Sequence, residues 1–304
     1  MRFGQLVTEL RSREITMRAD GDRLLVAPKQ AVTSEIADAI RTHKPMLISL
    51  ARLEATFGPL ELDGDDDLGR AANPGQLGPL PKRPVVTHPA RWTPAILDAI
   101  EPVITDLGLP VHDPFAGTGE RLGARCDNVA LPFTGTEIEA PFIIDPRVNQ
   151  GDSTDPATYP PHPFVAVTSP VYPNGMADHF RARDTSKRHT YRQALATILG
   201  YDQPLHANNM GRYAGRTRRG MTSERKHFDI ARRCIVHWPD HVVVNVKDVI
   251  TKTEVVPVVE LWKELLITRA YEVVDEIKVA TPGQRNGANG DARADHEVVI
   301  VAHR

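Results

Sequence analysis

The chain has few cysteines and no long hydrophobic run. Cys126 and Cys234 are its only cysteines. They stand far apart, without Cys-x-x-Cys or histidine spacing, which argues against a disulfide framework and against a zinc site. No run of about 18 apolar residues is present, so no bilayer-spanning helix and no membrane partner are expected. The charges in the N-terminal stretch MRFGQLVTELRSRE come too early for a signal peptide, and we therefore expect a cytoplasmic protein.

An excess of charge of one sign is also missing. The 37 Lys and Arg residues face 39 Asp and Glu residues, a net charge of -2, which argues against a uniformly basic protein that coats nucleic acid. A local basic surface is still predicted within residues 176–233, where Arg, Lys and His alternate with aromatic residues. A solvated loop is the alternative. The residues predicted to contact phosphate groups are Arg212, Arg216, Arg218, Arg219 and Lys226.

The composition divides the chain unequally. Residues 56–86 combine the acidic run LDGDDD with repeated Gly and Pro and have no sustained periodicity, which is typical of a linker. This predicts a small domain at 1–55 and a large domain at 87–304. In the small domain, apolar residues at helical spacing, a hairpin around the turn DGD and two further apolar helical stripes predict the order αββαα.

This small module resembles the N-terminal docking domain of tubulysin-type megasynthetases. The resemblance covers residues 6–51, including the turn DGD, the exit APK and the closing stretch HKPMLISL. It implies a protein partner whose terminal segment adds to the edge of the hairpin. The alternative is that the module only packs against the rest of the chain.

The large domain alternates helices and strands, which predicts a parallel α/β sheet with helices on both faces. Helices are expected at 93–107, 121–129 and 255–270, and strands near 110–115, 132–139, 163–170 and 241–250. Two more strands, at 271–282 and 296–304, are expected to close the sheet as an antiparallel pair. Such an ending is that of the Rossmann-like methyltransferase sheet.

A glycine-rich turn, VHDPFAGTGERL at 111–122, follows the first of these strands. Gly117 and Gly119 allow bare backbone N–H groups to approach a ligand, but Leu122 replaces the third glycine of a dinucleotide fingerprint. The carboxylate of Asp113 suits a cationic or amino-bearing ligand, so phosphate binding is disfavoured. At the next strand end Glu137 can take ribose hydroxyls, and Asp152 lies within reach of an adenine amino group.

The stretch TSPVYPNG, 168–175, ends the following strand. The order DPFAGTG, then Glu137, then SPVYPNG resembles the DNA amino-methyltransferases, which act on cytosine N4 or adenine N6 of double-stranded DNA. Val171 stands where a second proline is usual. The resemblance implies that Ser169, Pro170 and Tyr172 hold the flipped base. It also implies S-adenosylmethionine as cofactor, for which the predicted binding residues are Thr93, Asp113, Pro114, Phe115, Gly117, Gly119, Glu137 and Asp152.

The residue types suit methylation of an exocyclic amine. Such an amine is a poor nucleophile, and the Ser169 hydroxyl and Pro170 carbonyl oxygens can accept its hydrogens as the methyl group approaches. Tyr172 offers a face on which an extruded base can stack. Methylation of a ring carbon would need a cysteine nucleophile, typically after a proline, but both cysteines follow arginine.

Two other functions stay open at this point. One is an RNA enzyme, because the amino-methyltransferases of tRNA guanosine share similar motifs. The other is a cofactor-binding protein that docks partners without catalysis, against which the intact Ser169, Pro170 and Tyr172 argue.

Overall fold

The computed structural model describes residues 1–60, 92–171, 206–210, 223–251, 254–281 and 295–304. The chain divides into two compact units, Met1–Leu80 with Glu260–Glu272, and Pro81–Val259 with Val273–Arg304. The expected linker lies largely outside the described residues, and the predicted domain boundaries stay a prediction. Among the described residues, no helix is long and apolar enough to cross a bilayer.

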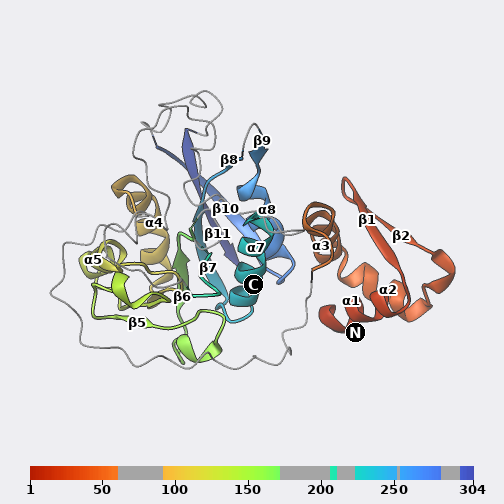
Figure 1. Ribbon diagram of the computed structural model, residues 1–304, viewed down its shortest axis with the longest axis horizontal. Helices are drawn as coiled ribbons and strands as arrows, with labels where there is room; N and C mark the ends of the chain where they lie inside the picture. The colour runs from red at the N-terminus through yellow and green to blue at the C-terminus, as the bar shows by residue number, and fades with distance from the viewer. Residues whose placement is uncertain (61–91, 172–205, 211–222, 252–253, 282–294) are drawn as a thin grey trace. The chain divides into compact units, whose positions relative to one another are not determined.

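The N-terminal residues fold in the predicted αββαα order (Figure 1). β1 and β2 pair antiparallel across a turn in which Gly21 has a φ of +55°. The hydroxyl of Thr33 accepts the N–H of Ile36 and so caps α2. The elements are α1 (Phe3–Ser12), β1 (Thr16–Asp20), β2 (Arg23–Ala27), the short 3-10 helix η1 (Lys29–Ala31), α2 (Ser34–Thr42) and α3 (Lys44–Phe57).

A seven-stranded sheet forms the centre of the second unit, with the strand order β10-β11-β7-β6-β3-β4-β5. Strands β5, β4, β3, β6 and β7 run parallel, and β11 runs antiparallel to β7. This confirms the predicted fold class, a Rossmann-like methyltransferase sheet. The strands are β3 (Val111–Asp113), β4 (Phe133–Glu137), β5 (Val148–Gln150), β6 (Val165–Thr168), β7 (His241–Val246), β10 (Glu272–Ala280) and β11 (His296–His303).

Helices flank this sheet. α4 (Pro94–Leu107) and α5 (Glu120–Asn128) lie on one side and α7 (Ser223–Ile235) on the other (Figure 1). The short 3-10 helices η2 (Ala140–Phe142) and η3 (Pro156–Thr158) precede and follow β5.

One predicted strand and one predicted helix have wrong bounds. The strand expected at 241–250 ends at Val246, because Asp248 turns away to accept the N–H of Val259 at 3.0 Å. The chain then forms a separate antiparallel pair, β8 (Val249–Thr251) and β9 (Glu254–Val256). The helix expected from residue 255 therefore begins later, as α8 (Val258–Ile267).

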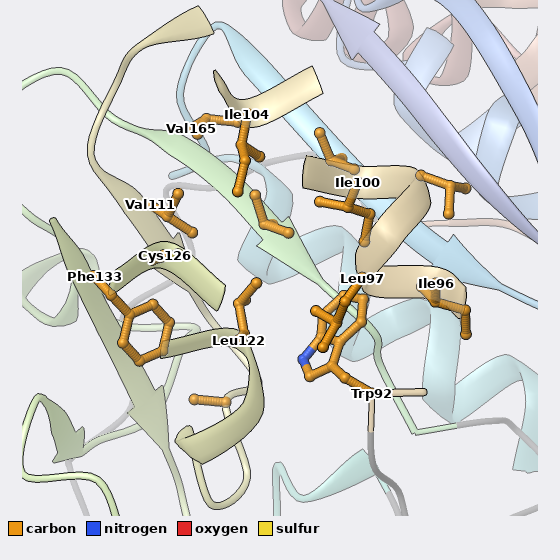
Figure 2. Packing of buried hydrophobic residues seen from close by; sticks show 14 of the residues in the cluster. Trp92, Ile96, Leu97, Ile100, Ile104, Val111, Leu122, Cys126, Phe133 and Val165 are labelled. Carbon is orange, nitrogen blue, oxygen red and sulfur yellow. The ribbon is translucent and has the colours of Figure 1, made fainter. Parts of the chain in front are cut away.

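A continuous hydrophobic core joins α4 and α5 to one face of the sheet. Ile100 and Ile104 of α4 are fully buried against strand residues such as Val111 and Val165 (Figure 2). Residues four apart lie on one face of a helix, which explains why α4 presents a single apolar stripe. Trp92, just before α4, packs at the end of this core, and its place there brings it to the edge of the sheet where the strands end.

Candidate functional site

A cavity lies at the carboxyl ends of the parallel strands. It holds about 740 Å³ of empty space, part of it open to solvent. In open α/β sheets this edge is the usual place for a ligand, because loops from several strands meet there. The lining residues are Trp92, Pro114, Phe115, Ala116, Gly117, Thr136, Glu137, Ile138, Asp152, Ser153, Ser169, Val171, Asn208, Asn209, Met210, Ile230 and Cys234.

The two glycines of the turn after β3 serve different purposes. Gly117 lines the cavity at a φ of +56°, and its N–H donates to Glu137 Oε2 at 3.0 Å. Gly119 is the N-cap of α5 at a φ of +71°. A Cβ on Gly119 would lie 2.4 Å from Val148 Cγ2, so the close packing of the turn on β5 requires glycine. Gly119 is not among the lining residues.

Asp113 lies behind the cavity wall. Its side chain is 1% exposed, and it accepts the N–H of Phe115 at 2.9 Å and the hydroxyl of Thr168 at 2.7 Å. The Trp92 side chain also hydrogen-bonds this carboxylate, while burial raises its pKa to about 6. Asp113 therefore holds two cavity residues, Trp92 and Phe115, in place. A direct contact with the cofactor stays a prediction.

Glu137 is the buried carboxylate that does line the cavity. Its two oxygens accept the N–H groups of Gly117 at 3.0 Å and of Glu139 at 2.9 Å. Burial, and next the negative charge of Glu139, raise its pKa to about 7. The carboxylate thereby fixes the glycine turn while its own surface faces the cavity.

Asp152 lines the cavity and ties down a short segment, residues 206–210. Its Oδ2 accepts the amide of Asn208 at 2.7 Å, and Asn208 Oδ1 accepts from Arg233 of α7 at 2.8 Å. Glu139 holds the same segment, because its Oε1 accepts the backbone N–H of His206 at 2.7 Å. The segment therefore forms part of the cavity wall.

Trp92, Asn208, Asn209 and Met210 are among the lining residues that the sequence did not predict. Residues 206–210 fell inside the segment assigned to target recognition. Their only signal was the pair of consecutive asparagines, unusual in a stretch otherwise dominated by Arg, Lys and His. The only signal for Trp92 was its place directly before the Thr93 cap.

The predicted base-binding motif is partly described. Ser169 and Val171 line the same cavity as Glu137, and Pro170, which lies between them in the chain, is buried. Tyr172 lies outside the described residues. Thr93 caps α4 by accepting the N–H of Ile96 at 3.4 Å and is not among the lining residues.

The predicted phosphate contacts cannot be located, with one exception. Arg212, Arg216, Arg218 and Arg219 lie outside the described residues. Lys226 lies on α7, where its Nζ is 3.2 Å from Asp229 Oδ2. The phosphate-binding role of these five residues stays a prediction.

Comparisons with known proteins bear on the two units differently. Residues 4–52 match the family described as the TubC N-terminal docking domain, which confirms the resemblance predicted for the small module. None of the curated protein sequences matches the chain.

Several solved structures that are similar to the chain are described as methyltransferases. The magnesium protoporphyrin IX methyltransferase of Synechocystis PCC 6803, crystallised with bound SAM, is 9% identical, with 69% of this chain and 78% of that chain covered and a TM-score of 0.37. The 1,6-didemethyltoxoflavin-N1-methyltransferase of Burkholderia thailandensis is 12% identical, with 69% of this chain and 78% of that chain covered and a TM-score of 0.37. A putative RNA methyltransferase of Pyrococcus horikoshii is 14% identical, covering 73% and 90%, at 0.36. Similarity this low carries no argument about activity.

The raised pKa of Glu137 predicts a pH-dependent stability. Its pKa is about 7 in the folded chain and 4.5 otherwise, so the folded state binds more protons between these values. The contribution of Glu137 to the free energy of unfolding is therefore full below pH 4.5 and is lost as the pH rises through about 7. We expect the free energy of unfolding of the wild type, relative to Glu137→Gln, to fall between about pH 4.5 and pH 8.

Urea unfolding of both proteins across this range measures the difference. Other titrating groups, among them Asp113 and His112, remain in both proteins and largely cancel. Parallel stability curves would show that Glu137 stays ionised in the folded chain.

Proposed function

We propose that the second unit is an S-adenosylmethionine-dependent methyltransferase that acts on an exocyclic amine of a DNA base, cytosine N4 or adenine N6. The observation that carries this proposal is that Glu137 and Ser169, which follow different strands, line one cavity. A cofactor group and an acceptor group must face the same space if a methyl group is to pass between them. Asp152 and Gly117 line that space as well.

The cavity residues suit this cofactor. Two carboxylates, Glu137 and Asp152, can accept hydrogen bonds from ribose hydroxyls and from an adenine amino group, and neither environment favours a phosphate. Gly117 presents no side chain where the methionine moiety would lie, and Trp92 and Phe115 supply flat apolar walls. The bound cofactor supplies an electrophilic methyl group.

The chain's own part in the reaction is to hold the acceptor amine. We expect the Ser169 hydroxyl and Pro170 carbonyl oxygens to accept its hydrogens, which would favour electron density on the nitrogen. Tyr172 would stack on the extruded base. A thiolate route is disfavoured, because burial raises the pKa of Cys126 to about 12 and that of Cys234 well above its ordinary value.

Labelled methyl transfer tests this function. The full chain is incubated with labelled S-adenosylmethionine and either unmodified duplex DNA or tRNA, and the nucleosides are then analysed. We expect label in N4-methylcytosine or N6-methyladenine from the duplex. Label in tRNA guanosine would support the RNA alternative, and cofactor binding without any transfer would support a non-enzyme.

A second role, protein docking, is proposed for the small module. Its support is the match of residues 4–52 to the docking-domain family. In the described residues β1 and β2 pair only with each other, so each presents an outer edge to which a partner strand can add. Leu25, which lies on β2 beside the outer edge of that strand, is 40% exposed.

A further inference from the structure

A buried polar chain lies beneath Ser169. Asn245 of β7 donates through Nδ2 to Ser169 Oγ at 3.2 Å and to Glu297 Oε2 of β11 at 2.7 Å. Asn245 is 1% exposed and Glu297 is 5% exposed. Val299 lies directly opposite Asn245, and alternation along a strand puts Glu297 on the same face of the sheet as Val299. The three polar side chains therefore form one line across the ends of three neighbouring strands.

This polar chain is costly in its surroundings. The neighbours of Asn245 along β7 are valines, from Val242 to Val246, and all are fully buried. Asn245 Oδ1 has no hydrogen-bond partner within the described chain, and an unmade buried hydrogen bond destabilises a fold. An apolar residue would serve β7 better as a strand. A role at the site explains why the asparagine is there.

Glu297 sets the direction of the hydrogen bonds. An ionised carboxylate can only accept, so the Asn245 atom that faces it is the amide nitrogen. The same nitrogen faces Ser169, which must therefore accept from Asn245. One lone pair of the serine oxygen is occupied in this way, and its hydrogen points away from Asn245. Since Ser169 lines the cavity, one donor and one acceptor are left for a ligand there.

We propose that Asn245 and Glu297 are positioning residues that make Ser169 select a base whose exocyclic amine adjoins an unprotonated ring nitrogen on its Watson–Crick edge. This rests on the function proposed above. The hydroxyl accepts an amine hydrogen and donates its own hydrogen to the ring nitrogen. Cytosine offers this pair at N4 and N3, and adenine at N6 and N1. The Watson–Crick edge of guanine does not, because N–H groups stand at both positions.

A base analogue isolates the hydrogen bond to the ring nitrogen. Replacing that nitrogen by C–H in the target base, as 3-deazacytosine or 1-deazaadenine, keeps the amine and removes the acceptor. We expect the wild-type chain to lose about tenfold or more in kcat/KM on duplex DNA that carries the analogue. Part of this loss reflects altered base pairing, so the informative quantity is how the loss changes between protein variants.

A paired substitution reverses the hydrogen bonds at nearly unchanged shape. In Asn245→Asp with Glu297→Gln, the carboxylate oxygen that replaces Nδ2 accepts from the new amide and also accepts the Ser169 hydrogen. The serine then has no donor for the base. We expect the discrimination between normal and analogue DNA to shrink about tenfold relative to the wild type, while the affinity for S-adenosylmethionine in calorimetry stays within about twofold. If Asn245 and Glu297 had a merely structural role, the ratio of kcat/KM on normal DNA to kcat/KM on analogue DNA would not change.

Glu297→Gln alone is the second variant, in case the pair fails to fold. Without the carboxylate the Asn245 amide can turn, so discrimination should again fall. Wild-type discrimination retained in a folded variant, on DNA that the wild type methylates, would overturn this inference and leave the proposed function standing. A wild-type chain that methylates no base would instead overturn the proposed function.

Discussion

Ser169→Ala should lower the turnover number of methyl transfer about 10-fold to 100-fold, while the affinity for S-adenosylmethionine stays within about twofold. Ser169 lines the cavity together with Glu137, but it follows β6, whereas the predicted cofactor contacts follow β3, β4 and β5. Removal of its hydroxyl therefore takes away an interaction with the acceptor base and leaves the cofactor contacts intact. Steady-state kinetics on a verified DNA substrate, together with calorimetry of cofactor binding, measures the two effects separately.

Ser12→Ala provides the matched control. Its hydroxyl lies in the small module and donates to the carbonyl of Glu9 in the same helix, so neither kinetics nor affinity should change. If Ser169→Ala lowered cofactor affinity as much as turnover, the hydroxyl would belong to the cofactor site. If it kept full methyl transfer, the turn after β6 would be structural.

The parts of the site that could be predicted from sequence are those at strand ends. In a parallel sheet the carboxyl ends of all strands meet at one edge, so recognising three strands was enough to bring Gly117, Glu137 and Ser169 together. The same reasoning did not determine the surroundings of Asp113. It ends β3, yet its carboxylate accepts from Phe115 and Thr168 behind the cavity wall, and the direction of one side chain at a strand end has no signature in the chain.

Contacts between distant segments could not be predicted. Asn245 stands in the stretch HVVVNV, which on its own is simply an apolar strand with one polar residue. Its meaning depends on Glu297, 52 residues further along, and on the register that sets Asn245 opposite Val299. Asn208 likewise depends on Asp152, which is 56 residues away. Such pairs depend on how distant segments align in the folded chain, and no local sequence pattern determines that alignment.

Glu137→Ala should weaken binding of S-adenosylmethionine by about 1 to 3 kcal/mol, which is about a fivefold to 150-fold loss of affinity. Two effects add. The cavity loses the acceptor proposed for the ribose hydroxyls, and the N–H groups of Gly117 and Glu139 lose the carboxylate that now holds the glycine turn. Calorimetry at about pH 8, above the raised pKa of about 7, compares the wild type in its ionised form with the variant.

Asp155→Asn is the matched control for this prediction. Asp155 follows β5 near the same edge of the sheet and accepts the N–H of Ala157 at 2.9 Å. It is not among the residues that line the cavity, so Asp155→Asn should bind the cofactor with the affinity of the wild type. Glu137→Gln separates the two effects, because its single amide oxygen can accept from only one side and its NH₂ group must face the other N–H. An affinity loss close to that of Glu137→Ala is therefore expected. Unchanged affinity in both Glu137 variants would mean that this carboxylate only braces the turn, and the proposed cofactor site would have to lie elsewhere in the cavity.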